Sequence, residues 1–74
     1  MDIEVRLFAS FRDNRWKSKH LIINKGTTIR KIIEQIYINE KDLGIVLING
    51  RHSNIDSVLE NNDILALFPP VGGG

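Results

Sequence analysis

Residues 26–37 read GTTIRKIIEQIY, and in this segment the apolar residues recur with the spacing of an α-helix. They stand at positions i, i+3, i+4, i+7 and i+8, namely Ile29, Ile32, Ile33, Ile36 and Tyr37. This pattern places them on one face of a helix. Thr28, or else Thr27, suits the N-cap, because its hydroxyl can accept from a free backbone N–H of the first turn. Isoleucine is not a strong helix former, so we expect tertiary packing to hold the helix.

Strand patterns lie on both sides of this helix. Ile3, Val5 and Leu7 alternate with charged residues, which is typical of a strand with one buried face. Further strands are predicted at residues 20–24, 45–48, 51–53 and 64–68. The turn between residues 45–48 and 51–53 is predicted at Asn49-Gly50, because both residues tolerate positive φ. Residues 9–19 are expected to form a loop or a short irregular turn.

The predicted order is therefore β-β-α-β-β-β, an α+β fold in which one main helix packs on a mixed β-sheet. In such an arrangement the first and last strands lie side by side and parallel, as in the β-grasp, or ubiquitin-like, architecture. We expect residues 1–68 to form this domain and residues 69–74 to form a flexible C-terminal Gly-Gly tail. Between the last two strands, we expect Ile55, Val58 and Leu59 to point inward.

Composition excludes several kinds of chemistry. The chain has 74 residues and no cysteine, so disulfides, thiolate metal sites and cysteine nucleophiles are impossible. His20 and His52 fall in separate predicted strands without a second ligand at metal spacing, and no nucleotide-binding glycine loop is present. We expect no metal, no bound cofactor and no catalysis by this chain alone. The longest apolar run has five residues, 64–68, and no signal peptide is visible, which favours a cytoplasmic protein without a membrane partner.

Charge is distributed unevenly along the chain. Residues 12–31 hold seven basic residues and one acidic residue, a balance of +6, whereas the remainder holds three basic and eight acidic residues, a balance of −5. Such asymmetry can mark a nucleic-acid face. The alternative is a solvated loop and one helix face. Because aromatic and basic residues do not interleave here, we expect no nucleic-acid partner.

The last six residues read PPVGGG. Proline has no N–H for a β-ladder and favours an extended conformation, so Pro69 and Pro70 are expected to aim the tail away from the domain. Six residues reach at most about 20 Å. Glycines lack Cβ atoms, so Gly72 and Gly73 could pass through a narrow channel and bring the carboxylate of Gly74 to another protein's reactive centre. The alternative is a tail without a function of its own.

The segment LFPPVGGG, residues 67–74, resembles the C-terminal signature of the MoaD group in the MoaD/ThiS family of ubiquitin-like sulfur carriers. Further matching places are Leu7-Phe8-Ala9, Phe11-Arg12, residues 26–29 and residues 48–50. Three places depart from the pattern. Gly72 stands where the family more often has alanine or serine, and Asn61-Asn62-Asp63 replaces a Gly-Asp turn. Residues 9–19 are short and basic, without the regular small helix that the family pattern leads us to expect there.

This resemblance implies the small subunit of molybdopterin synthase. A MoeB-like adenylyltransferase would adenylate Gly74 with ATP and magnesium, and a donor such as a cysteine desulfurase or rhodanese would supply sulfur for a thiocarboxylate. Within a heterotetramer, that group would enter the active site of a MoaE-like large subunit and donate its sulfur to a pterin precursor of the molybdenum or tungsten cofactor. Gly72 and Gly73 would give access, and Pro69 and Pro70 would orient the tail.

The expected partner-binding residues lie near the tail and near the end of the first strand. They are Phe68, Val71, Phe8, Phe11 and Arg12. All five residues of 64–68 are apolar, so both faces of this predicted strand are apolar. One alternating set, either Leu65 and Leu67 or Ile64, Ala66 and Phe68, must therefore face away from the helix. An outward apolar set stays bare unless a partner covers it. For each of the three phenylalanines, packing in the core is the alternative.

Two other functions remain open at this stage. A ThiS-like carrier would supply sulfur for thiamin or for tRNA thiolation. A ubiquitin-like covalent modifier would be joined through Gly74 to lysines of target proteins.

Overall fold

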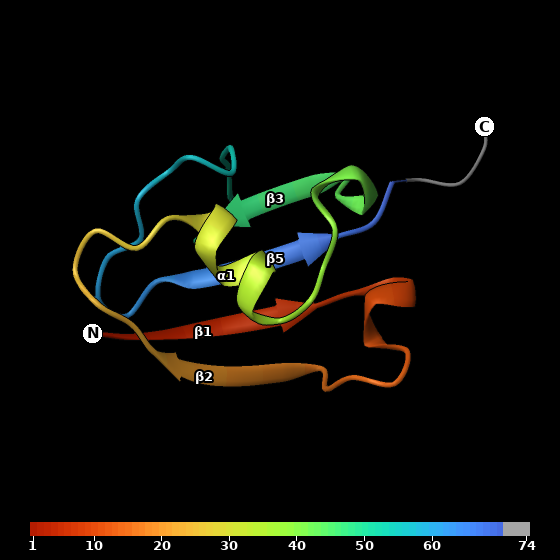
Figure 1. Ribbon diagram of the computed structural model, residues 1–74, viewed down its shortest axis with the longest axis horizontal. Helices are drawn as coiled ribbons and strands as arrows, with labels where there is room; N and C mark the ends of the chain where they lie inside the picture. Colours follow the sequence, from red (N-terminus) through yellow and green to blue (C-terminus); the bar gives the residue numbers. More distant parts are fainter. Residues whose placement is uncertain (71–74) are drawn as a thin grey trace.

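The computed structural model describes residues 1–70 of the chain. Its elements, in chain order, are β1 (Asp2–Leu7), the 3₁₀ turn η1 (Ala9–Arg12), β2 (Ser18–Ile22), α1 (Ile29–Gln35), the 3₁₀ turn η2 (Glu40–Asp42), β3 (Ile45–Ile48), β4 (Arg51–His52) and β5 (Ile64–Phe68). The five strands form one sheet in the order β2-β1-β5-β3-β4, and α1 crosses one face of it (Figure 1). β1 and β5 are parallel, and the other neighbours are antiparallel. The predicted β-grasp fold with a mixed sheet is confirmed.

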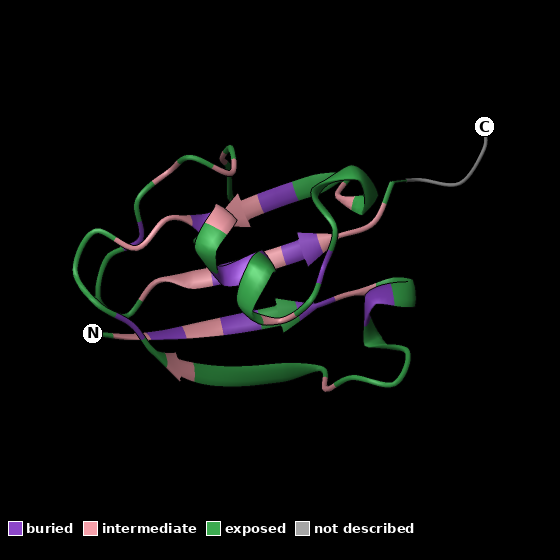
Figure 2. Cartoon of the chain, viewed as in Figure 1, coloured by how far each residue is buried: buried purple, intermediate pink, exposed green. Residues whose placement is uncertain are grey.

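The central strand pair fixes the core. Leu7 lies opposite Leu67 in the parallel register, and both side chains are fully buried. Alternate residues of β1 and β5 point toward α1, which supplies Ile29, Ile32 and Ile33 from its inner face. Buried positions therefore line the space between helix and sheet (Figure 2). The residue pattern of period two in the strands and period 3.6 in the helix predicted this packing.

The helix begins as predicted and ends earlier. The Thr28 hydroxyl accepts from the backbone N–H of Lys31, which makes Thr28 the N-cap. At the other end the N–H of Ile38 donates to the carbonyl of Ile33, and that of Tyr37 donates to Glu34. These two bonds form a Schellman motif, in which the residue after the C-cap is left-handed.

Tyr37 is that left-handed residue, with φ of 61°. Its side chain is 88% exposed, so its predicted place on the buried stripe is wrong. The reversal of the backbone at Tyr37 directs Ile38 into the core instead, where it is 6% exposed. Val58, predicted to point inward, is likewise 55% exposed, whereas its neighbour Leu59 is buried.

The first hairpin also differs from the prediction. β2 comprises residues 18–22 rather than 20–24, because Leu21 pairs with Ile3 and Ser18 with Arg6. β2 is an edge strand of the described sheet, so polar residues at its start can remain in solvent. Within the predicted loop, Ala9–Arg12 forms one 3₁₀ turn.

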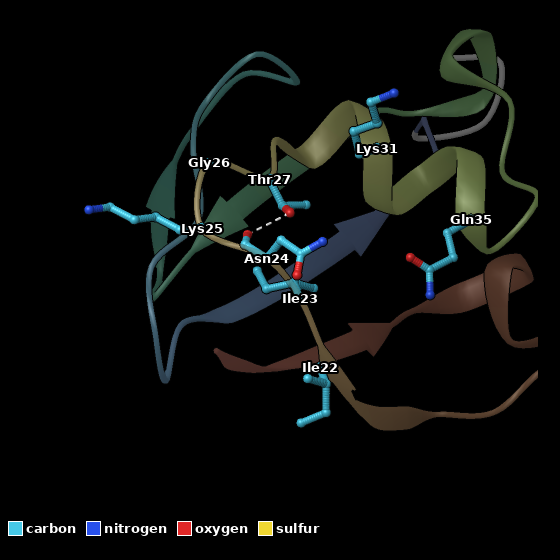
Figure 3. Close-up of a pocket in the computed structure, with 8 residues that line it drawn as sticks. All are labelled: Ile22, Ile23, Asn24, Lys25, Gly26, Thr27, Lys31 and Gln35. Carbon is cyan, nitrogen blue, oxygen red and sulfur yellow. Dashed lines mark hydrogen bonds between the residues drawn. The ribbon is translucent and has the colours of Figure 1, made fainter.

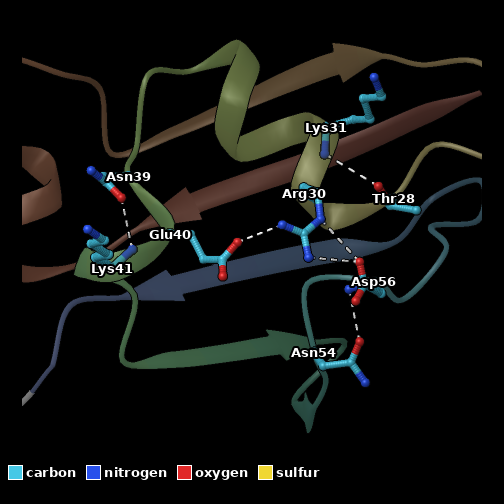
Figure 4. A network of polar contacts seen from close by, with 8 residues as sticks. All are labelled: Thr28, Arg30, Lys31, Asn39, Glu40, Lys41, Asn54 and Asp56. Carbon is cyan, nitrogen blue, oxygen red and sulfur yellow. Dashed lines mark hydrogen bonds and ion pairs between the residues drawn. The ribbon is translucent and has the colours of Figure 1, made fainter.

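A polar network fastens the outer side of α1 (Figure 4). The guanidinium of Arg30 donates to Asp56 at 3.1 and 3.2 Å and to Glu40 at 2.6 Å. These contacts join the helix to η2 and to the connection before β5. All three side chains are largely exposed, so the network orients these loops more than it stabilises the fold.

Candidate functional site

β5 presents one of its two apolar sets to the outside. Leu65 and Leu67 face α1 and are fully buried, while the alternate residues of β5 point to the opposite face of the sheet. They join side chains from β3 and from the end of β1 in a surface that we call the outer apolar face. It consists of Phe8, Ile45, Leu47, Ile64, Ala66 and Phe68. The sequence left open which set of β5 is outward, and the register with β1 answers that question.

Two aromatic rings dominate this face. The rings of Phe8 and Phe68 are stacked, with centroids 4.3 Å apart and planes 9° from parallel. The guanidinium carbon of Arg12 lies 5.0 Å from the centroid of Phe8, within the range of a cation–π contact. The Nε–H of Arg12 also donates to the carbonyl of Leu7 at 2.6 Å, which holds the guanidinium in place. The structure thus brings together three of the five predicted docking residues.

An open hollow lies beside the stacked rings on the same face. Its volume is about 420 Å³, and Leu47, Ile64 and Ala66 contribute to its apolar lining. Arg6 and the turn at Asn49-Gly50 form polar parts of its border. Such a concave apolar surface with a few charged groups at its edge suits an apolar side chain of a partner protein. Leu47 was missed from the sequence, because only its pairing with Ala66 brings it to this face.

Phe11 corrects the predicted set. Its side chain is 6% exposed and belongs to the core. The η1 turn rotates the chain after Phe8, so Phe11 points toward the helix side rather than toward the outer apolar face. Of the two readings left open for Phe11, core packing is the one observed.

The tail starts at the border of the outer apolar face. Phe68 is the last residue of β5, and its carbonyl accepts from the N–H of Gly44 at 2.8 Å. Pro69 and Pro70 follow without regular secondary structure. The predicted site residues Val71, Gly72, Gly73 and Gly74 lie outside the described residues.

The basic residues of 12–31 are spread over η1, the segment after it, β2, the loop before α1 and α1 itself. Four have partners within the chain: Arg12 and Lys19 lie over aromatic rings, Arg15 donates to two main-chain carbonyls, and Arg30 is paired with two carboxylates. The η1 turn lies at the end of the sheet from which the tail departs, whereas the loop with Lys25 lies at the opposite end (Figure 1). The absence of a nucleic-acid partner stays a prediction.

A second hollow lies between α1 and the end of β2, remote from the tail (Figure 3). It has a volume of about 390 Å³, and Lys25, Lys31 and Gln35 are among its lining residues. The hydroxyl of Thr27 donates to the carbonyl of Asn24 at 2.7 Å, which closes the turn at its border. Its lining side chains include no acidic residue or histidine, and its two charged groups are the lysines.

Three titratable groups have shifted pKa values: Glu4 on β1, His20 on β2 and Arg30 on α1, whose pKa is raised by its hydrogen bond to Asp56. A hydrogen bond from His20 to Asp2, at 2.9 Å, raises the pKa of the imidazole, and the negative charges of Asp2 and Glu4 add to this effect. The hydrogen bond from Arg6 lowers the pKa of Glu4. Within residues 1–70, no three side chains of the metal-binding types are grouped so that they could hold an ion.

The part of the chain that the structure describes also contains no helix long and apolar enough to cross a membrane.

A β-grasp domain whose last strand ends at Phe68 beside an apolar face, and whose sequence continues as PPVGGG, defines the class of ubiquitin-like carriers and modifiers. The sequence model of the ThiS family matches residues 5–74. The chain belongs to this family, the MoaD/ThiS sulfur carriers. A search of curated protein sequences found no match.

Solved structures agree with this assignment. A Pyrococcus furiosus protein assigned as subunit 1 of a molybdopterin converting factor is 25% identical, with a TM-score of 0.80 over 96% of this chain and 99% of the other. SAMP1 from Haloferax volcanii is 22% identical, with a TM-score of 0.79 over the whole of both chains. A chain in the Helicobacter pylori complex of molybdopterin-converting factor subunits 1 and 2 is 24% identical, with a TM-score of 0.65 over the whole of both chains. The last two similarities establish the fold alone.

Proposed function

We propose that this chain is the sulfur-carrying small subunit of a molybdopterin synthase. The observation that supports the proposal most directly is the position of the tail. It departs from Phe68, at the border of a face where two stacked rings and an apolar hollow are open to a partner. The family match extends to Gly74, and the Pyrococcus furiosus relative covers nearly the whole chain.

In this function the reacting group is the carboxylate of Gly74. Its oxygen attacks the α-phosphorus of ATP in a MoeB-like adenylyltransferase, and pyrophosphate leaves. Magnesium and ATP belong to that enzyme. The persulfide of a cysteine desulfurase or a rhodanese then attacks the acyl carbon, AMP leaves and an acyl disulfide forms; a thiol cleaves it, takes the donor's sulfur into a new disulfide and releases the thiocarboxylate. Glycine at Gly72 and Gly73 leaves the acyl carbon unhindered, because neither residue has a Cβ atom.

The large subunit would receive both the domain and the tail. The outer apolar face docks on a MoaE-like subunit, with the Phe8–Phe68 stack at the centre of the contact and Arg12 at its edge. Aromatic side chains and arginine are the residue types that contribute most to protein interfaces. Two small and two large subunits would form the heterotetramer. Pro69 and Pro70 direct the tail into the active site of the large subunit, where the thiocarboxylate gives its sulfur to a pterin precursor.

Intact-mass measurement tests the carrier function. The chain is incubated with the organism's adenylyltransferase, ATP, magnesium and a sulfur donor, and the expected product is heavier by the exchange of one oxygen for sulfur. Deletion of Gly74 should abolish this product, whereas Tyr37→Ala, which changes an exposed residue outside the site, should not. Failure of every adenylyltransferase of the organism to modify the chain would contradict the proposal. Transfer of sulfur to a pterin precursor by the chain and its large subunit then separates this role from thiamin or tRNA thiolation.

A covalent modifier is the second candidate, because the fold is shared over the whole of both chains with SAMP1, which is named a small archaeal modifier protein. A modifier would use the same adenylated Gly74 but transfer the acyl group to a lysine amine. Conjugates that survive denaturing gels and, after trypsin digestion, carry the C-terminal peptide of this chain, residues 52–74, on a lysine would support this function. A modifier transfers its acyl group to a lysine amine, whereas a carrier receives sulfur on that group. Both start from the same adenylated protein, so conjugation and thiocarboxylate formation are measured on one preparation.

A further inference from the structure

Gly44 lies directly opposite the point where the tail begins. It precedes β3, and Ile45 pairs with Phe68 in the antiparallel ladder with β5. One step further along the same register, Gly44 faces Pro69. Its N–H donates to the carbonyl of Phe68 at 2.8 Å, beyond the last strand pair.

The space around Gly44 excludes a side chain. A Cβ atom at this position would lie 2.6 Å from the carbonyl oxygen of Pro69, 2.6 Å from the Cα of Pro70 and 2.7 Å from the carbonyl carbon of Pro69. All three atoms belong to the main chain, so a side-chain rotation cannot relieve the overlap. Gly26 and Gly50, by contrast, have positive φ and no atom within 4 Å of an added Cβ. Gly44 differs from both, because it is needed for close approach.

The two sides of this contact differ in how firmly they are held. β5 is paired with β1 up to Leu67 and with β3 up to Phe68, and the carbonyl of Leu67 also accepts from the N–H of Phe8 at 3.2 Å. Pro69 and Pro70 follow the ladder and have no N–H with which to extend it. An added methyl group at Gly44 would therefore displace the prolines more readily than the strand.

We propose that Gly44 is a positioning residue for the tail: its missing side chain lets the Pro69–Pro70 main chain pass close to the residue just before β3, and this close approach sets the direction in which the tail leaves the domain. The contact at Gly44 does not depend on the proposed function. Only its consequence, the delivery of Gly74 to an active site, rests on that function. The stacked rings of Phe8 and Phe68 provide the docking contact, and Gly44 fixes the path of the chain relative to that contact.

Solution NMR tests the geometry without reference to any enzyme. In the wild-type protein we expect strong cross-peaks between the Hα protons of Gly44 and Pro70. In Gly44→Ala those cross-peaks should be lost and the carbon shifts of Pro69 and Pro70 should change, while the contacts between the Phe8 and Phe68 rings persist. The wild-type measurement keeps the proposal testable if the variant fails to fold. Absence of the wild-type cross-peaks, or an unmoved proline pair in a folded Gly44→Ala, would overturn it.

Adenylation kinetics test the consequence. For Gly44→Ala we expect kcat to fall about tenfold, because misplacement of a reacting group by about 1 Å costs one to two orders of magnitude in rate. KM should change less than about twofold, since the substitution leaves the outer apolar face and the rest of the surface of the domain intact. Gly26→Ala is the matched control: it adds the same methyl group at a left-handed glycine remote from the tail and should leave kcat unchanged. Equal kcat values for Gly44→Ala and wild type would overturn the delivery role. If even the wild-type chain is not adenylated, the carrier function fails, while the NMR result still decides the role of Gly44 in tail direction.

Discussion

Phe8 and Phe68 stack because the parallel register of β1 and β5 places them side by side. Leu7 is opposite Leu67 and both point inward. The residues that follow them, Phe8 and Phe68, therefore both point to the outer face of the sheet and lie next to each other. The rings approach to 4.3 Å between centroids, and both remain half-buried. A preformed aromatic pair needs little ordering when a partner binds, which favours affinity.

Phe68→Ala should weaken binding to the large subunit by about 30-fold or more, the size expected for a residue at the centre of an interface. Loss of the ring also removes the stacking partner of Phe8, so Phe8→Ala should have a similar effect. The double variant should lose less binding free energy than the sum of the losses in the two single variants. Isothermal titration calorimetry measures the affinity. Ile22→Ala is the control, because Ile22 is 78% exposed on β2 and lies outside the outer apolar face. Wild-type affinity for Phe68→Ala would contradict docking through this face.

The fold could be predicted from the sequence because its signals are local. Alternation in residues 2–7, the isoleucine stripe of the helix and the Asn49-Gly50 turn each depend on short-range chemistry. Tyr37 could not be placed in this way, since a left-handed helix end usually carries glycine and here carries an aromatic residue.

The candidate site depends on contacts between distant segments and was only partly predictable. Phe8 and Phe11 are the same residue type three positions apart, and the η1 turn alone makes one exposed to a partner and the other part of the core. Gly44 carries no signal in the sequence, because its role appears only when β3 and β5 are paired.

Tyr37→Gly should stabilise the protein. The residue has φ of 61°, a conformation that costs a non-glycine residue about 1 kcal/mol or more, and its ring is 88% exposed and contributes little packing. A gain of about 1 kcal/mol corresponds to a rise in Tm of about 4–8 °C for a domain of this size. Thermal unfolding followed by circular dichroism measures it. Tyr37→Ala keeps the strained conformation, so its Tm should stay near that of the wild type; an equal rise in both variants would argue against strain as the cause.

Asn49 should stabilise the fold through its side chain as well as through the turn. Its Oδ1 accepts from the N–H of Ile64 at 2.8 Å, and its Nδ2 donates to Asp63 at 2.9 Å, so it holds the start of β5 against the β3–β4 turn. Asn49→Gly retains the tolerance for positive φ and loses both hydrogen bonds, at an expected cost of about 1 kcal/mol.

Asn49→Ala should cost about 2 kcal/mol, because it loses the same bonds and also places a β-carbon at φ of 51°. Urea unfolding measures both variants. Equal stability of Asn49→Gly and wild type would show that the side-chain bonds contribute nothing, and the whole effect would then belong to the turn.

His20 should make the protein more stable at acidic than at alkaline pH relative to a variant without the imidazole. The hydrogen bond to Asp2 and the nearby carboxylate of Glu4 raise the pKa of His20 above its ordinary value of 6.5. A raised pKa means that the folded state binds the proton more tightly than the unfolded state, so the stabilisation is complete below 6.5 and disappears as the pH rises through the higher folded value. The free energy of unfolding of wild type and His20→Gln, measured in urea well below and well above that range, should differ more at the lower pH. Asp2→Asn removes the principal hydrogen-bond partner of His20, so it should shrink the pH-dependent difference in unfolding free energy that His20→Gln reveals. If His20→Gln has the same pH-dependent effect in the Asp2→Asn protein, groups other than Asp2 cause it. Because the pair is exposed, added salt should weaken the effect as well.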